Sequence, residues 1–302
     1  MKKYALIIPV NLRKINWYCA FLHSIDKDKL QELDFDLVIC TSNLQEQDTI
    51  MSCLQIIAKE YVPYIKVLDI DTYIRETSQL PESLRYLLQT GGVINVKKFC
   101  ALHWAMLKYE YVAVADCDIL FRDKESPSKL FARCIENYEK NIYITSTPPS
   151  NDLFKSIMMS CSIFYPERDQ ATLKNLTNEW TTYPWFFELP VYKKEDLAQF
   201  FSFVENKSPI PFWYCLSWLS FEHLVFIYFR LLYFNCQFKD VTHITNGRRV
   251  LEHTNFDFLT KIENDTGYLP IWMSSRMFIE SIQHGHEAAK QEILMFSHAD
   301  RI

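Results

Sequence analysis

The chain has 302 residues, of which 49% are hydrophobic and 23% are charged, and this composition excludes an intrinsically disordered protein. Its net charge of −5 argues against nucleic acid as a partner, because phosphate binding needs a basic surface. The 9 scattered cysteines include no CxxC pair, so we expect no zinc site and a reducing compartment. The short apolar N-terminal segment predicts a strand and not a signal peptide, and we therefore expect a cytoplasmic protein.

Short apolar runs alternate with segments of helical periodicity in the first part of the chain. Strands are predicted at residues 4–10, 35–42, 65–70 and 111–115. Helices are predicted around residues 17–25, 49–61 and 95–109. This alternation, with strands that are apolar throughout, is typical of an α/β protein whose parallel sheet is covered by helices on both faces.

The second half of the chain has a different pattern. Residues 141–147 and 160–166 are predicted to be strands, and beyond residue 166 the chain becomes aromatic, less regular and more helical. We expect one continuous domain made of a first part, 1–166, and a second part, 167–302.

Residues 210–234 form an aromatic run that is long enough to span a bilayer. The run contains Glu222, His223 and Arg230, and charged side chains at these positions are costly in lipid. We therefore expect a folded helix that is buried or lies at an interface. A peripheral contact with a membrane is compatible with this segment.

Two carboxylates, Asp116 and Asp118, follow the predicted strand 111–115 and are separated by Cys117. Ligands of open parallel sheets bind outside the carboxyl ends of the strands, which is where these residues are expected. A carboxylate pair on one side of the chain suits a hard divalent cation, which prefers oxygen ligands. The alternative is that Asp-x-Asp only ends the strand and begins a turn.

The stretch KKFCALHWAMLKYEYVAVADCDILF, residues 97–121, resembles the nucleotide-sugar glycosyltransferases of the GT-A fold. In that superfamily a helix that starts with a basic residue leads into a strand, and this strand ends in Asp-x-Asp followed by an apolar pair. The stretches IIPVNLR, VICTSN and SCSIFYP are similar to other strands of the fold. The resemblance covers roughly residues 4–166. It implies a GT-A sheet in 1–166 that binds the nucleotide sugar and an acceptor-side region in 167–302.

The resemblance also implies roles for individual residues. Asp118 would ligate Mn²⁺ or Mg²⁺, Asp116 would contact the metal or the ribose, and His253 is the favoured third metal ligand. A cation there would stabilise the charge that develops on the leaving diphosphate of a UDP- or GDP-sugar. The other residues expected around the nucleotide sugar are Asn11, Arg13, Thr41, Asp69, Lys98 and Cys117. Two of them have simpler alternatives: Lys98 as a solvated helix residue and Asp69 as the end of a strand.

Glu222 is the candidate general base. Inversion at the anomeric carbon requires a base for the acceptor hydroxyl of a glycan or glycolipid. Glu222 lies early in a predicted helix, with Ser220 as its expected N-cap, and its apolar surroundings predict a raised pKa. The alternative is a glutamate that caps the helix or forms a salt bridge.

Two other classes of protein remain open. The stretch AVADCDILF also resembles the first motif of the haloacid-dehalogenase phosphatases, with Asp116 as nucleophile and Asp118 as acid, although Leu120 stands where Thr or Val is usual. A non-catalytic sugar-binding module is the third class. Such a module could also bind a lipid surface, and the aromatic run 210–234 would serve it. Independently of this class, Trp180, Trp185, Trp213 and Trp218 suggest a carbohydrate-stacking surface, although large aromatic side chains are more often part of a core.

Overall fold

A computed structural model describes residues 2–89, 94–117, 119–121, 127–145, 152–183, 189–240 and 272–274. Its main sheet has five strands in the order β3-β2-β1-β4-β7. Four strands are parallel: β1 (Tyr4–Pro9), β2 (Phe35–Thr41), β3 (Ile65–Asp69) and β4 (Tyr111–Val114). The short edge strand β7 (Val191–Lys193) runs antiparallel to β4. The predicted α/β fold with a mainly parallel sheet is confirmed.

The central strand β1 pairs with β2 from Tyr4 opposite Phe35 to Pro9 opposite Cys40, and with β4 on its other side. Both β2 and β4 are buried along their whole length. Strands that are covered on both faces must be apolar throughout, and this explains why the sequence shows continuous apolar runs there.

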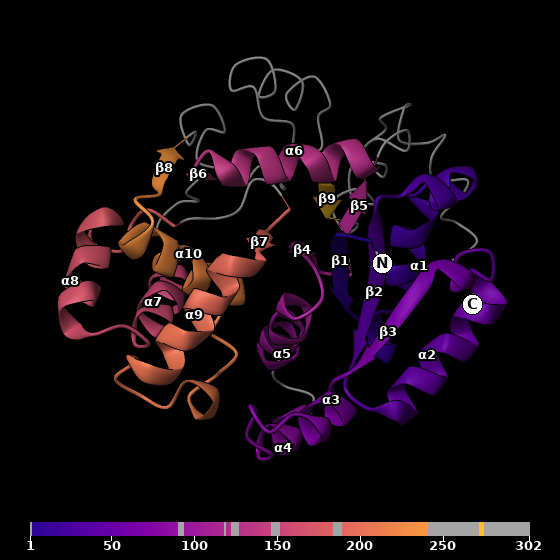
Figure 1. The fold of residues 1–302 in the computed structure, drawn as a ribbon, viewed down its shortest axis with the longest axis horizontal. Coiled ribbons are helices and arrows are strands. Elements are labelled where there is room, and N and C mark those ends of the chain that lie inside the picture. The colour runs from indigo at the N-terminus through magenta and orange to yellow at the C-terminus, as the bar shows by residue number, and fades with distance from the viewer. Residues whose placement is uncertain are drawn as a thin grey trace.

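Helices cover both faces of the sheet, with α1 and α2 on one side and α5 on the other (Figure 1). The helical segments of the first half are η1 (Leu12–Lys14), α1 (Ile15–His23), η2 (Lys27–Glu32), α2 (Leu44–Ile57), η3 (Val62–Tyr64), α3 (Ile70–Glu76), α4 (Leu84–Gln89) and α5 (Ile94–Met106). The predicted helices around 17–25, 49–61 and 95–109 correspond to α1, α2 and α5.

The second half forms a mostly helical lobe beside α5 (Figure 1). Its helical segments are α7 (Asp152–Ser162), α8 (Glu167–Leu176), α9 (Lys194–Asn206), η4 (Phe212–Tyr214) and α10 (Glu222–Tyr233). The preceding helix α6 (Pro127–Glu139) runs across the top of Figure 1 from the lobe to the main sheet, where its Phe131 stacks on Phe35 of β2. Two small sheets join distant segments: β6 (Ile142–Thr145) pairs with β8 (Gln237–Asp240), and β5 (Ile119–Phe121) pairs with β9 (Trp272–Ser274).

The strand predicted at 160–166 is wrong, because residues 160–162 are the last residues of α7. Buried apolar residues at helical spacing, Phe154, Ile157, Met158 and Cys161, extend into that stretch and fix it as a helix. Pro166 is the N-cap of the next helix, α8.

The run 210–234 forms η4 and the 12-residue helix α10, as a folded segment. Within the ranges that the structure describes, no helix combines the length and the apolar character that crossing a bilayer requires.

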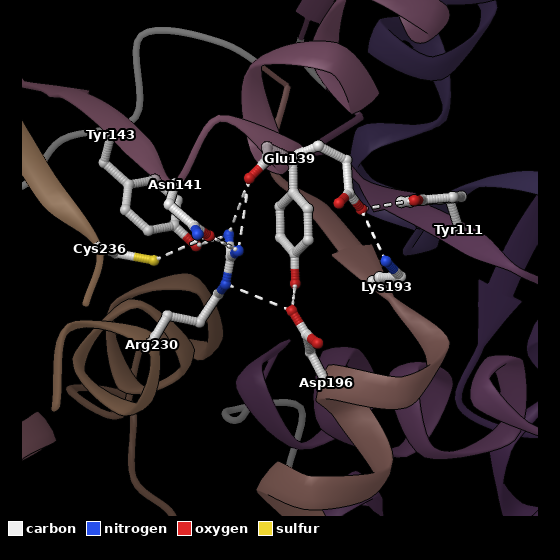
Figure 2. A network of polar contacts seen from close by, with 9 residues as sticks. Tyr111, Glu139, Asn141, Tyr143, Lys193, Asp196, Arg230 and Cys236 are labelled. Atoms are coloured by element: carbon white, nitrogen blue, oxygen red, sulfur yellow. Dashed lines mark hydrogen bonds and ion pairs between the residues drawn. The ribbon is translucent and has the colours of Figure 1, made fainter. Parts of the chain in front are cut away.

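A buried arginine on α10 connects four elements of the lobe (Figure 2). Arg230 lies 3.4 Å from the Asp196 carboxylate of α9, and its guanidinium donates to Asn141 Oδ1 at 2.6 Å and to Tyr143 Oη at 3.0 Å. The guanidinium also stacks 3.6 Å from the centre of the Tyr138 ring, and the Tyr138 hydroxyl donates to Asp196. A buried charge needs such partners, and here they hold α6, β6, α9 and α10 together.

We predict that Arg230→Met lowers the free energy of unfolding by roughly 3–5 kcal/mol, because it leaves the Asp196 carboxylate buried without its cation. Urea unfolding followed by circular dichroism measures the change. Lys140→Ala is the control: Lys140 forms a half-exposed ion pair with Glu136, whose loss should change stability little. Equal effects of the two substitutions would contradict a stabilising role for the buried network.

Candidate functional site

Polar residues follow the strands of the main sheet at its carboxyl edge. Strands β2 and β3 lie on one side of β1, and the next strand, β4, lies on its other side, so the strand order reverses at β1. Parallel sheets bind ligands at such a switch in strand order, outside the carboxyl ends of the strands. Asn11 follows β1 and Asp116 follows β4, so these two predicted site residues flank the switch point.

Lys98 of α5 lies between two carboxylates at this edge. Its Nζ atom is 2.9 Å from Asp116 Oδ1 and 3.3 Å from Glu222 Oε1. The Lys98 and Glu222 side chains are buried, at 10% and 2% exposed, whereas the Asp116 side chain is 49% exposed. We call these three residues the Lys98 cluster. It places a buried cation directly behind a carboxylate that solvent or a ligand can reach.

Burial and ion pairing act against each other in the Lys98 cluster. Burial alone would lower the pKa of Lys98, but Asp116 and Glu222 outweigh it and raise this pKa above its usual value. Partial desolvation would raise the pKa of Asp116, but the Lys98 ammonium holds it below its usual range. For Glu222 the effect of burial is larger than that of the Lys98 ammonium, and the pKa of Glu222 is raised. The predicted raised pKa of Glu222 is therefore confirmed, and a salt bridge accompanies it.

The fold explains why Lys98 lies at this edge. Because α5 leads into a parallel strand, its N-terminal turns lie at the carboxyl edge of the sheet. The neighbouring Lys97 has a different environment, since successive helix residues point about 100° apart. Lys97 donates to the Val10 carbonyl at 3.0 Å and to Glu46 Oε2 at 2.9 Å, which fastens the end of β1 to the first turn of α2.

Sequence reasoning missed the role of Lys97, although a lysine within an apolar helix was a signal for a buried partner. The alternative of a solvated Lys98 is wrong, because the side chain is buried and paired. Ser220 is not the N-cap of α10; Phe221 is. The Ser220 hydroxyl instead accepts a hydrogen bond from the Ser217 amide at 3.0 Å.

Two predicted nucleotide-binding residues have buried oxygens without a hydrogen-bond partner in the described part of the chain. They are Asn11 Oδ1, after β1, and Thr41 Oγ1, at the end of β2. Glu222 Oε2, in the Lys98 cluster, is a third such atom. Buried polar atoms without partners are rare in folded proteins, and at a sheet edge they are candidates for contact with a ligand.

The remaining predicted residues differ in their surroundings. Asp69 caps α3: its carboxylate accepts from the Thr72 amide at 3.2 Å and from the Thr72 hydroxyl at 3.1 Å. Arg13 is exposed in η1. Cys117, the residue that follows Asp116 in the sequence, is buried. Asp118 and His253 lie outside the described residues.

His223 lies beside the Lys98 cluster, with its Nδ1 atom 4.0 Å from Glu222 Oε1. Burial, helped by the Lys98 charge, lowers the pKa of His223 to about 3. The imidazole is therefore neutral near pH 7 and adds no charge to the site.

The described residues contain no group of three or more His, Cys, Asp or Glu side chains that could hold a metal ion. Of the three predicted metal ligands, Asp116 alone lies among the described residues. Lys98 occupies its Oδ1 atom, while the half-exposed side chain leaves the carboxylate accessible from outside.

No protein-family model matches the sequence, and no curated protein matches it. Solved structures of several glycosyltransferases are similar to the chain. Mouse xyloside xylosyltransferase 1 has a TM-score of 0.42 at 10% identity, over 79% of this chain and 84% of that one. The bifunctional glycosyltransferase WbbM has a TM-score of 0.40 at 10% identity, and this chain spans 39% of its length. The galactosyltransferase LgtC, in complex with donor and acceptor sugar analogues, has a TM-score of 0.30 at 8% identity, over 72% of this chain and 83% of that one.

We predict that Lys98→Met lowers the free energy of unfolding by roughly 3–5 kcal/mol near pH 7, because Glu222 is left buried without its cation. The loss should shrink towards pH 5. Without Lys98 the pKa of Glu222 rises further, so the folded protein takes up a proton that the unfolded chain does not, and stability rises as the pH falls. The double variant Lys98→Met/Glu222→Gln should recover much of the loss.

Urea unfolding of the single and double variants at both pH values measures this coupling. The control is Lys3→Met, which removes an exposed lysine paired with Glu110 at 3.2 Å and should have little effect. Additive losses in the double variant would show that Lys98 and Glu222 do not interact.

Proposed function

We propose that the protein is a metal-dependent glycosyltransferase that moves a sugar from a nucleotide-sugar donor to an acceptor hydroxyl. The Lys98 cluster is the observation that carries this proposal. Its buried ammonium and its accessible carboxylate lie at the switch point of a parallel sheet, where nucleotides bind in proteins of this architecture. The likeness of residues 97–121 to the GT-A glycosyltransferases supports the same function.

The donor nucleotide is proposed to lie over the ends of β1 and β2. The buried oxygens of Asn11 and Thr41 at these ends would there gain the hydrogen-bond partners that they lack. The exposed Arg13 in η1 is close enough in the chain to contribute a cation to the phosphates.

The diphosphate of the donor is proposed to lie at Asp116 and Lys98. The glycosidic oxygen of the leaving diphosphate gains negative charge as the bond to the sugar breaks, and the Lys98 ammonium stabilises this charge. Asp116, with Asp118 and His253 as further proposed ligands, would hold Mn²⁺ or Mg²⁺. When bound, such an ion neutralises diphosphate charge.

Glu222 is proposed to act as the general base of an inverting transfer. Lys98 holds its Oε1 atom, while the buried Oε2 atom accepts no hydrogen bond from the described residues. As the acceptor oxygen bonds to the anomeric carbon, its proton passes to Glu222 and the bond to the diphosphate oxygen breaks. The raised pKa makes Glu222 a stronger base than a solvated carboxylate.

We predict that the wild-type protein slowly hydrolyses one UDP- or GDP-sugar when Mn²⁺ is added. We also predict that Asp116→Asn weakens donor binding roughly tenfold or more, since losing about 1.4 kcal/mol of binding free energy raises the Kd tenfold. Calorimetry and a nucleotide-release assay measure the two effects. Asp48→Asn, at an exposed position of α2, is the matched control and should behave as wild type. Vanadate-sensitive hydrolysis of p-nitrophenyl phosphate, with no nucleotide-sugar turnover, would indicate the phosphatase instead.

We predict that Glu222→Gln reduces transfer by roughly 10²–10⁴, the usual effect of losing a general base, while donor affinity changes little. In the wild type, activity should fall as the pH drops through the raised pKa of Glu222, because the base must be deprotonated. The variant should lack this acid limb. Glu205→Gln, at an exposed position of α9, is the control. Near-normal transfer by Glu222→Gln would remove Glu222 from the mechanism.

A further inference from the structure

We propose that Trp218 forms a subsite for the acceptor, in which its indole ring stacks against a neutral pyranose ring beside the Lys98 cluster. This inference rests on the glycosyltransferase function proposed above and adds a location for the acceptor. Trp218 is 58% exposed, whereas Trp180 and Trp213 are buried at 8% and 6% exposed. Trp185 lies outside the described residues. Of the sugar-stacking candidates that the structure describes, Trp218 alone presents its ring to solvent.

The turn that carries Trp218 is held by its own hydrogen bonds. The Ser217 amide donates to Ser220 Oγ at 3.0 Å, and the Leu219 amide donates to Ser217 Oγ at 3.2 Å. The thiol of Cys161 on α7 donates to the Leu219 carbonyl at 3.3 Å. An aromatic side chain on such a fixed turn loses little further conformational freedom when a ligand binds.

The turn is also fastened to the helix that carries Lys98. The Asn95 side chain donates to the carbonyls of Ser217 and Trp218, both at 3.1 Å. One helical turn later, Lys98 contacts Glu222. The segment from Ser217 to Glu222 is therefore attached at both ends to a single turn of α5, and this attachment holds the backbone of Trp218 on the same helical turn as Lys98.

The chemistry of this position fits a sugar. An exposed indole leaves a large apolar surface in water, and covering it with the C–H face of a pyranose is favourable without requiring a charge. The amide side chain of Asn95 and the hydroxyls of Ser217 and Ser220 are already engaged within the turn. Recognition at Trp218 is therefore expected to be stacking on a neutral ring.

The position favours the acceptor over the donor. The proposed nucleotide site lies at the ends of β1 and β2, while the Trp218 turn approaches the Lys98 cluster from the side of α10. Trp218 precedes the proposed base, Glu222, by four residues on the same segment. A sugar stacked on Trp218 would thus be held by the segment that also carries the proposed base.

Saturation-transfer NMR with methyl α- and β-pyranosides of common hexoses and pentoses tests the subsite directly. We expect signals from at least one glycoside with the full-length wild type, and their loss in Trp218→Ala. Trp218→Phe, which keeps an aromatic face, should retain part of the signal. Leu107→Ala removes another exposed apolar side chain, 56% exposed just after the far end of α5, and should bind as wild type. Circular dichroism confirms that each variant is folded.

A separate calorimetric titration with UDP and GDP in the presence of Mn²⁺ distinguishes this inference from the proposed function. Unchanged nucleotide affinity in Trp218→Ala, together with a roughly tenfold higher acceptor KM, supports the acceptor subsite. Equal glycoside signals in wild type and Trp218→Ala, or no signal with the wild type, would overturn it. A parallel loss of nucleotide affinity would overturn the assignment to the acceptor. If the wild type binds no nucleotide, the proposed function fails, and the glycoside signals still decide the stacking site.

Discussion

The ammonium of Lys98 must remain between the carboxylates of Asp116 and Glu222, and the geometry of the site depends on this constraint. A buried lysine is stable as a cation only with partners of opposite charge, and Glu222, at 2% exposed, equally needs the cation. The three residues come from α5, from the segment after β4 and from the start of α10. Their ion pairs thus join the sheet half of the molecule to its helical lobe at the point where a ligand is expected.

The order of the strands explains why the ion pairs of Lys98 lie at the carboxyl edge of the sheet. Because β1, β2 and β4 are parallel, their carboxyl ends and the N-terminal turns of α5 lie at one edge. Lys97 fastens β1 to α2 there, and Lys98, the next residue, faces the cluster. Away from this edge, the network around Arg230 fixes the lobe that presents Glu222 and the Trp218 turn. The Arg230 network and the Lys98 cluster therefore share helix α10, which carries Glu222 at its start and Arg230 two turns later.

The sequence was sufficient to predict what depends on local pattern. The parallel strands were predictable because residues such as Leu6, Val38 and Val114 form uninterrupted apolar runs, which a doubly covered sheet requires. The strand predicted at 160–166 is wrong because the helical spacing of Phe154, Ile157 and Cys161 continues into that stretch.

Contacts between distant segments could not be predicted in the same way. Lys98 and Glu222 are separated by more than a hundred residues, and no periodicity links them, so their ion pair emerged only from the fold. The same holds for the attachment of the Trp218 turn to Asn95. Asp69 was a predicted site residue, and in the structure it caps a helix. The sequence could not distinguish these two roles, because both require an aspartate at the end of a strand.

The most direct test of the central claim is a crystal structure of the protein with UDP or GDP and Mn²⁺. We expect the diphosphate at the carboxyl edge between β1 and β4, with a phosphate oxygen within hydrogen-bonding distance of Lys98 Nζ and the metal ion on the Asp116 carboxylate. A nucleotide bound elsewhere, with the Lys98 cluster unoccupied, would contradict it.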